Sequence, residues 1–272
     1  SFHVTGVQTC ALPIFCREYP NEYGEKIANI ALNAYVNQCG QATLAAAEAS
    51  RENGNSPNTV VSGAVAIVGK KMAEPAMDAA KALLSLFQFS KLSDPTGNYD
   101  YKEELNSAKS HKDTLLAAND DTCAERMVAH LNQGAQSIFI KFLIDFAKHE
   151  GGKPSTDAMI AAIWTTLGWG GLRSKKITRG TITRLPWYSR IYSTIVGVVA
   201  SADKHGEDSF CGIKLEELVP NFSFTRTAFL SLMGREPTDD ELFEFQVLLG
   251  LIITNGPDRK STRLNSSHVK RD

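Results

Sequence analysis

The sequence predicts a mainly α, multi-helical protein with one small β-hairpin near residues 191–213. Apolar residues recur at helical spacing through most of the chain, as at Ile27, Ile30 and Ala34. Capping residues, prolines and glycines separate these apolar stretches at short intervals, which is typical of a bundle of short helices. One segment, 191–200, combines β-branched and apolar residues ahead of a polar turn, and this pattern favours a strand.

The first quarter of the chain is expected to be helical. Residues 23–50 fit one long helix, which Asn53-Gly54-Asn55 ends. Ser56-Pro57 begins the next helix, because serine caps an N-terminus and proline fits the first helical position. The small, β-branched segment 59–68 fits either a tightly packed helix or a buried strand, and we favour the helix.

The middle of the chain is also expected to be helical. Glu74-Pro75 is predicted to open a helix with an alanine- and leucine-rich face. Residues 102–131 are polar and fit helices in short pieces. Residues 138–146 are strongly apolar, and the spacing of their phenylalanines suits a helix, although a strand is possible.

A clear break at Gly151 to Pro154 precedes the next helix, which Ser155 caps and which ends in Gly168-Trp169-Gly170-Gly171. Residues 191–200 and 209–213 are expected to form the two strands of the hairpin. Three further helices are then predicted, and the last begins with a capping box; they are expected at 214–219, 223–233 and 238–254.

The two ends of the chain correspond to one DNA sequence read on opposite strands. Residues 4–14 read VTGVQTCALPI and residues 258–268 read DRKSTRLNSSH. A DNA strand that encodes the first segment has a reverse complement that encodes the second, with all eleven codons paired. Because this DNA resembles a sequencing-library adapter, we expect the two ends to be translated adapter and the remainder to be an internal fragment.

We therefore expect five parts along the chain. The first and last, 1–14 and 258–272, are adapter without native structure. Between them, 15–171 is a helical region of unassigned role, 172–190 is a basic linker, and 191–257 is the start of a further domain.

The charge argues against nucleic acid as a partner. The whole chain carries a net charge of −1, and residues 258–272 supply five basic side chains against two acidic ones. The rest of the chain is therefore more acidic than the total suggests. Binding to nucleic acid requires a clustered basic surface, so we expect none.

Cysteine spacing and the lengths of the apolar runs indicate the compartment. Cys16, Cys39, Cys123 and Cys211 are widely spaced and form no CxxC pair. This spacing predicts neither a disulfide framework nor a zinc site, and we expect a reducing, cytoplasmic location. The longest apolar runs are too short and interrupted to cross a bilayer, so we also expect no membrane partner.

Four consecutive pieces of the C-terminal stretch resemble the citrate synthase superfamily. FCGIKLEEL at 210–218 resembles a hairpin strand followed by a helix start, and SFTRTAFLSLMG at 223–234 resembles the helix after it. REPTDDEL at 235–242 resembles the proline-threonine turn of the family. Residues 248–257 stand where the family has an apolar helix that runs into an active-site loop. The resemblance covers roughly 191–257, about a quarter of the chain.

The resemblance implies a multi-helical enzyme fragment of a homo-oligomeric parent. Such enzymes condense acetyl-CoA with oxaloacetate, or cleave citryl-CoA, so the implied substrates are a CoA thioester and oxaloacetate or citrate, with no covalently bound cofactor. The chemistry needs a general base and donors that hold the enolate. In the family a histidine that donates to the enolate precedes glycine; here Asn255 occupies that slot, before Gly256. An amide donates a hydrogen bond but transfers no proton. The second histidine, the aspartate base and the oxaloacetate-binding arginines of the family follow this point and have no counterparts in this sequence, so we expect the chain itself to be inactive.

The segment around 172–190 contains the one basic cluster, next to Trp169 and Trp187. Arg173, Lys175 and Lys176 are candidate ligands for the phosphates of CoA, although a solvated loop is the preferred interpretation. His205 lies in a polar loop, and an exposed turn is favoured over a metal or acid–base site. An alternative function is a non-catalytic helical scaffold, derived from the same fold, that binds CoA or protein.

Overall fold

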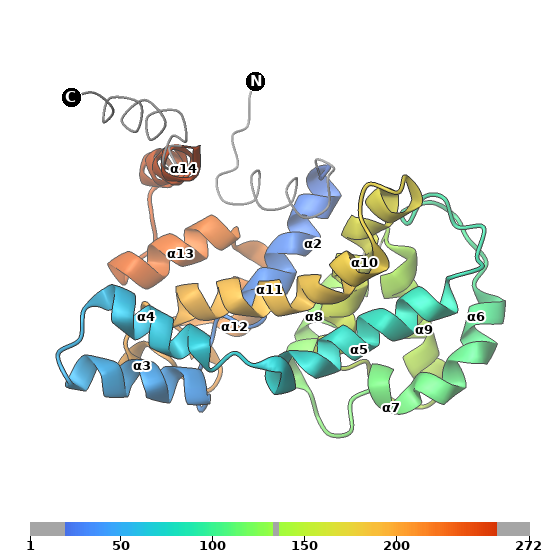
Figure 1. Ribbon diagram of the computed structural model, residues 1–272, viewed down its shortest axis with the longest axis horizontal. Helices are drawn as coiled ribbons and strands as arrows, with labels where there is room; N and C mark the ends of the chain where they lie inside the picture. The colour runs from blue at the N-terminus through green and yellow to red at the C-terminus, as the bar shows by residue number, and fades with distance from the viewer. Residues whose placement is uncertain (1–19, 133–135, 255–272) are drawn as a thin grey trace, which may run out of the picture.

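The structure is a computed structural model that describes residues 20–132 and 136–254, and within these ranges it is mainly helical (Figure 1). This confirms the predicted fold class. Thirteen α-helices are described: α2 (Glu22–Asn33), α3 (Ala42–Glu52), α4 (Pro57–Ala66), α5 (Lys70–Leu86), α6 (Lys102–Ser107), α7 (Lys112–Leu115), α8 (Thr122–Asn132), α9 (Ile138–His149), α10 (Thr156–Arg173), α11 (Arg179–Gly197), α12 (Leu215–Asn221), α13 (Phe224–Met233) and α14 (Asp239–Thr254). Short 3₁₀ turns lie at Ala108–His111 and Ala202–Lys204.

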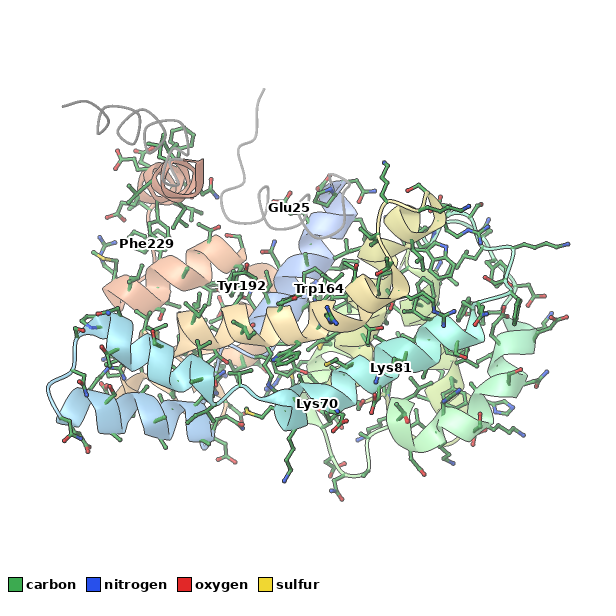
Figure 2. The ribbon with its side chains drawn as sticks, viewed as in Figure 1. Glu25, Lys70, Lys81, Trp164, Tyr192 and Phe229 are labelled. Atoms are coloured by element: carbon green, nitrogen blue, oxygen red, sulfur yellow. The ribbon has the colours of Figure 1, made fainter. Side chains whose placement is uncertain are left out.

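Helix α10 lies at the centre of the core, against α5, α9 and α11 (Figure 1). It is buried on nearly all sides, and Ser155 caps it by accepting a hydrogen bond from the Ala158 amide, as predicted. Figure 2 shows Trp164 of α10 among the packed helices, whereas Lys70 and Lys81 extend from the outer face of α5. Phenylalanines from α9 fill the space beside it; Phe139, Phe142 and Phe146 are fully buried.

The prediction of a strand at 191–200 is wrong, because α11 continues to Gly197; the same helix begins at Arg179, within the predicted linker at 172–190. Thr178 begins this helix in a reciprocal capping box with Thr181. The buried positions Ile182, Ser189 and Ser193 recur on one helical face, and the two serines donate to carbonyls of α2. Packing of this face outweighs the strand preference of the β-branched residues.

The hairpin is shorter than predicted. It pairs β1 (Ser209–Phe210) with β2 (Ile213–Lys214) in antiparallel register. Cys211 and Gly212 form the turn, both with positive φ, so Cys211 lies in the turn and is half-buried. The single apolar cluster of the body runs from Ile27 through α11 to Leu230, and it does not divide at the predicted domain boundaries.

Three helix boundaries also differ from prediction. The expected helix at 23–50 is two helices, α2 and α3, with Gly40 at positive φ between them. Helix α5 begins at Lys70 and contains Pro75, because its buried alanine face extends to both sides of the proline. Helix α10 continues through Gly168, where a Cβ atom would lie only 2.7 Å from the Ile182 side chain.

Helices α3 and α4 pack on each other and form a separate small apolar cluster of Ala47, Val60, Ala64 and Val198. Arg51 of α3 donates to the carbonyls of Val199 and Ala200, at 3.1 and 3.3 Å, just beyond the end of α11. The pair α3–α4 is thus joined to the body partly through one charged side chain.

Helix α14 packs mainly on α13 and stands apart from the body in Figure 1. The predicted capping box is confirmed: the Glu241 amide donates to Oγ1 of Thr238 and the Thr238 amide to the Glu241 carboxylate. Phe229 of α13 meets Phe245 edge to face, with ring centroids 5.5 Å apart (Figure 2). In the part of the chain that is described, no helix has both the length and the apolar character that a bilayer crossing demands.

Candidate functional site

Of the residues predicted as a site, three lie within the described part of the chain: Arg173, Lys175 and Lys176. Asn255 and Gly256 lie outside the described residues. Arg173 ends α10, and Lys175 and Lys176 follow in an exposed turn, where Lys175 has a φ of 60°. None of these three basic residues lines any of the cavities described below.

An acidic cavity of about 590 Å³ lies where α5, the segment before α8 and the start of α10 meet. Its lining includes Asp78, Asp113, Asp120, Asp121 and Asp157. Asp121 is fully used in helix capping: its carboxylate accepts from the amides of Ala124 and Thr156, at 2.9 and 2.8 Å. Asp121 therefore stabilises the starts of α8 and α10.

Asp157, on the wall of this cavity, belongs to a half-buried polar group that joins α10 and α11 to the turn after α2. The hydroxyl of Tyr35, in the turn after α2, donates to the Asp157 carboxylate, and the Arg190 guanidinium of α11 lies 4.2 Å from the centre of the Tyr35 ring. Arg190 also donates to the Met72 carbonyl at 2.6 Å. These contacts tie α10, α11 and the turn after α2 together, so the group supports the core.

Burial controls the protonation of this group. It raises the pKa of the Asp157 carboxyl, although the Tyr35 hydrogen bond and Arg190 partly oppose the shift. Burial and the Asp157 charge raise the pKa of Tyr35 well above its ordinary value, and burial raises that of the neighbouring Cys123 thiol to about 11. Tyr35 and Cys123 are therefore protonated near neutral pH, and Cys123 is not an activated nucleophile.

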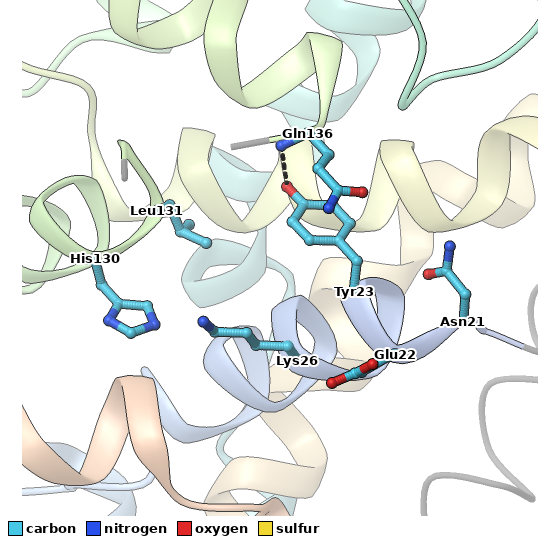
Figure 3. Close-up of a pocket in the computed structure, with 7 residues that line it drawn as sticks. All are labelled: Asn21, Glu22, Tyr23, Lys26, His130, Leu131 and Gln136. Carbon is cyan, nitrogen blue, oxygen red and sulfur yellow. Dashed lines mark hydrogen bonds between the residues drawn. The ribbon is translucent and has the colours of Figure 1, made fainter. Parts of the chain in front are cut away.

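A second cavity, of about 470 Å³, opens between α2 and the end of α8 (Figure 3). Tyr23 and Lys26 enter it from α2, His130 and Leu131 from α8, and Gln136 from the segment before α9. The Tyr23 hydroxyl oxygen accepts the amides of Gln136 and Ser137 at 3.2 and 3.1 Å, which fixes one wall. Figure 3 shows the Lys26 ammonium and the His130 ring directed toward each other across the cavity.

Sequence reasoning missed this second cavity. His130 is an isolated histidine in the sequence, with no further histidine or cysteine at a ligand-like spacing. Only the helical register of Lys26 and the place where α8 ends bring the two side chains together. No motif in the sequence encodes that approach.

The prediction of an exposed turn at His205 is wrong. The ring is 8% exposed and packs on Phe210, with centroids 5.0 Å apart. Nδ1 accepts the Gln38 amide at 3.1 Å, so Nε2 carries the proton and donates to the Gly197 carbonyl at 3.1 Å. His205 is therefore a structural residue that holds the loop after α2 against the end of α11.

Metal chemistry finds no support in the described ranges, where no group of three or more His, Cys, Asp or Glu side chains converges as metal ligands would. The described cysteines Cys39, Cys123 and Cys211 are free thiols. No family model, curated protein or solved structure matches this chain.

Proposed function

We propose that the chain carries part of the scaffold of a citrate synthase-like acyltransferase, which condenses acetyl-CoA with oxaloacetate or cleaves citryl-CoA. The observation that carries the proposal is the order of elements from β1 to α14. The pieces that resemble the family in sequence follow these elements in order: the hairpin with the start of α12, then α13, then the turn into α14, and finally the end of α14 as far as Thr254. The predicted caps at Ser223 and Thr238 form, and Gly234, in the left-handed conformation, ends α13.

The catalytic groups of this proposal lie toward and beyond the end of α14. In the slot of the family histidine, Asn255 would donate its amide to the enolate oxygen, with Gly256 beside it. A CoA thioester is the proposed acyl donor, and oxaloacetate or citrate the second ligand. We further propose a cytoplasmic location, which the free thiols support, because a reducing compartment keeps cysteines unpaired.

The uninterrupted reading frame of the parent protein tests the proposal. We expect it to release free thiol from acetyl-CoA only when oxaloacetate is present, or to form acetyl-CoA from citryl-CoA. Asn255→Ala in the active parent should lower kcat by about 100-fold, the effect of removing one donor to a developing oxyanion. A parent that neither condenses nor cleaves these substrates, although it binds them, would refute the acyltransferase.

A non-catalytic scaffold that binds CoA or protein is the second candidate. It is favoured by the exposed positions of Arg173, Lys175 and Lys176, none of which lines a cavity described above. Calorimetric titration of the parent with CoA, oxaloacetate and citrate separates the two candidates. Binding without turnover supports the scaffold, and turnover contradicts it.

A homo-oligomeric parent is part of the same proposal. The support is the apolar side of α14, where Phe243, Leu248 and Leu251 are 61%, 52% and 52% exposed. Exposed large apolar side chains on one helix favour association with another protein surface.

A further inference from the structure

The cavity between α2 and α8 contains a histidine nitrogen that has no partner. Nε2 of His130 is buried, and no hydrogen-bond partner for it lies among the described residues. A buried polar atom without a partner destabilises the folded state, so its retention calls for a physical reason. Figure 3 shows the His130 ring edge facing the Lys26 side chain across open space.

Lys26 faces the same space as a positive charge that is not neutralised. No salt bridge is found for it among the described residues. Its ammonium and burial together lower the pKa of His130, burial contributing more, so the two groups repel each other once the ring is protonated. Glu22 also lines the cavity, but Figure 3 shows the Lys26 ammonium extending toward His130 and not toward the Glu22 carboxylate.

The remaining walls suit an organic body. The Tyr23 ring and Leu131 provide apolar surface, and the side chains of Asn21 and Gln136 add amide donors and acceptors. A cavity of about 470 Å³ is larger than one small inorganic ion needs. An oxyanion placed between Lys26 and His130 would neutralise the charge and satisfy the buried nitrogen at once.

We propose that this cavity binds a small organic acid whose oxyanion, a carboxylate or a phosphate, lies between the Lys26 ammonium and Nε2 of His130. The ligand body lies along Tyr23 and Leu131. This site goes beyond the proposed function, because all of these residues precede the region that resembles the acyltransferase family. Failure of either proposal leaves the other standing.

Titration of the full chain with sodium phosphate and with sodium acetate, at constant ionic strength, tests the site. Ring proton resonances of His130, assigned with the His130→Gln variant, should shift and saturate with at least one of the anions. The ring pKa should rise on binding, because the anion favours the imidazolium. Acetate distinguishes a carboxylate ligand from a phosphate. A control titration with sodium chloride gives the shift caused by salt alone. If phosphate and acetate shift the His130 ring protons no more than sodium chloride does, the proposal is overturned.

Charge-matched variants separate a local site from general attraction. Lys26→Gln should weaken binding about tenfold, the loss of one charge-assisted hydrogen bond. Lys214→Gln removes the same charge from an exposed lysine beside Glu216 and should leave the affinity unchanged. Equal weakening in both variants would refute the site. Circular dichroism shows whether each variant is folded. If His130→Gln does not fold, the comparison of Lys26→Gln with Lys214→Gln still tests the site.

Discussion

Helices α10 and α14 are both strongly apolar, but only α10 is enclosed. Trp164 and Trp169 of α10 are 5% and 3% exposed, and helices α5, α9 and α11 surround it. Phe243 and Leu248 of α14 remain largely exposed, because α14 has one main neighbour, α13. An apolar helix sequence therefore predicts that the helix is buried, but the rest of the fold determines which elements pack on it.

The largest expected effect lies in the enclosed region. Phe87 is fully buried, and its ring centroid lies 4.9 and 5.2 Å from those of Phe139 and Phe142. Phe87→Ala should therefore lower the free energy of unfolding by about 3–5 kcal/mol. Phe89→Ala is the matched control, because Phe89 is 90% exposed and should cost about 0.5 kcal/mol or less. Chemical denaturation measures both, and equal losses would break the distinction between enclosed and exposed aromatic residues.

A second effect tests the close contact between α11 and the loop after α2. A Cβ atom at Gly197 would lie 2.2 Å from the Val36 carbonyl oxygen, so Gly197→Ala should cost about 3 kcal/mol. Gly63 on α4 has no heavy atom near its Cβ position. Gly63→Ala should therefore stabilise the protein by about 0.4–1 kcal/mol, because alanine has fewer unfolded conformations. Thermal and chemical unfolding read both variants; a neutral Gly197→Ala would contradict the close packing.

A third effect concerns His205, which joins the same two elements. His205→Ala leaves the Gln38 amide and the Gly197 carbonyl without this partner, so we expect a loss of about 2 kcal/mol at pH 7.5. Burial lowers the pKa of His205 in the folded state, so the unfolded chain binds its proton first as pH falls. The stabilisation is therefore complete above about pH 6.5 and decreases below it.

Unfolding free energies measured between pH 5 and 8 test this pH dependence. The wild-type protein should lose stability below about pH 6.5, and the slope should be smaller in His205→Ala. The slope should not vanish, because His130 also has a lowered pKa in the folded protein. An unchanged slope in the variant would exclude His205 as its source.

The smallest effect on stability is expected at α14. Replacing Phe243 by Ser should change the free energy of unfolding by about 0.5 kcal/mol or less, because the side chain is 61% exposed. The same change should reduce self-association at high protein concentration, since it removes exposed apolar surface. Sedimentation velocity measures the association. A wild-type chain that stays monomeric at high concentration would contradict the apolar interface.

The sequence predicted the helices whose first residues are capping residues. Ser155, Ser223 and the Thr238–Glu241 box begin their helices where they were expected. Helix α11 was not predicted because its buried face includes serines, which are polar residues. Their burial is favourable only because their hydroxyls donate to the carbonyls of α2. The cavity of Lys26 and His130 was missed for the same kind of reason, since only tertiary packing brings them together.

The Arg51 contact has a consequence for local opening. Helices α3 and α4 share only a small apolar cluster, and charged hydrogen bonds from Arg51 to the residues after α11 supplement it. Such a unit opens at lower free energy than the body, so its amides should exchange with solvent deuterium before those of α10. The chain thus contains a segment that can detach and return while the central helices stay intact, and added salt should increase its rate of exchange.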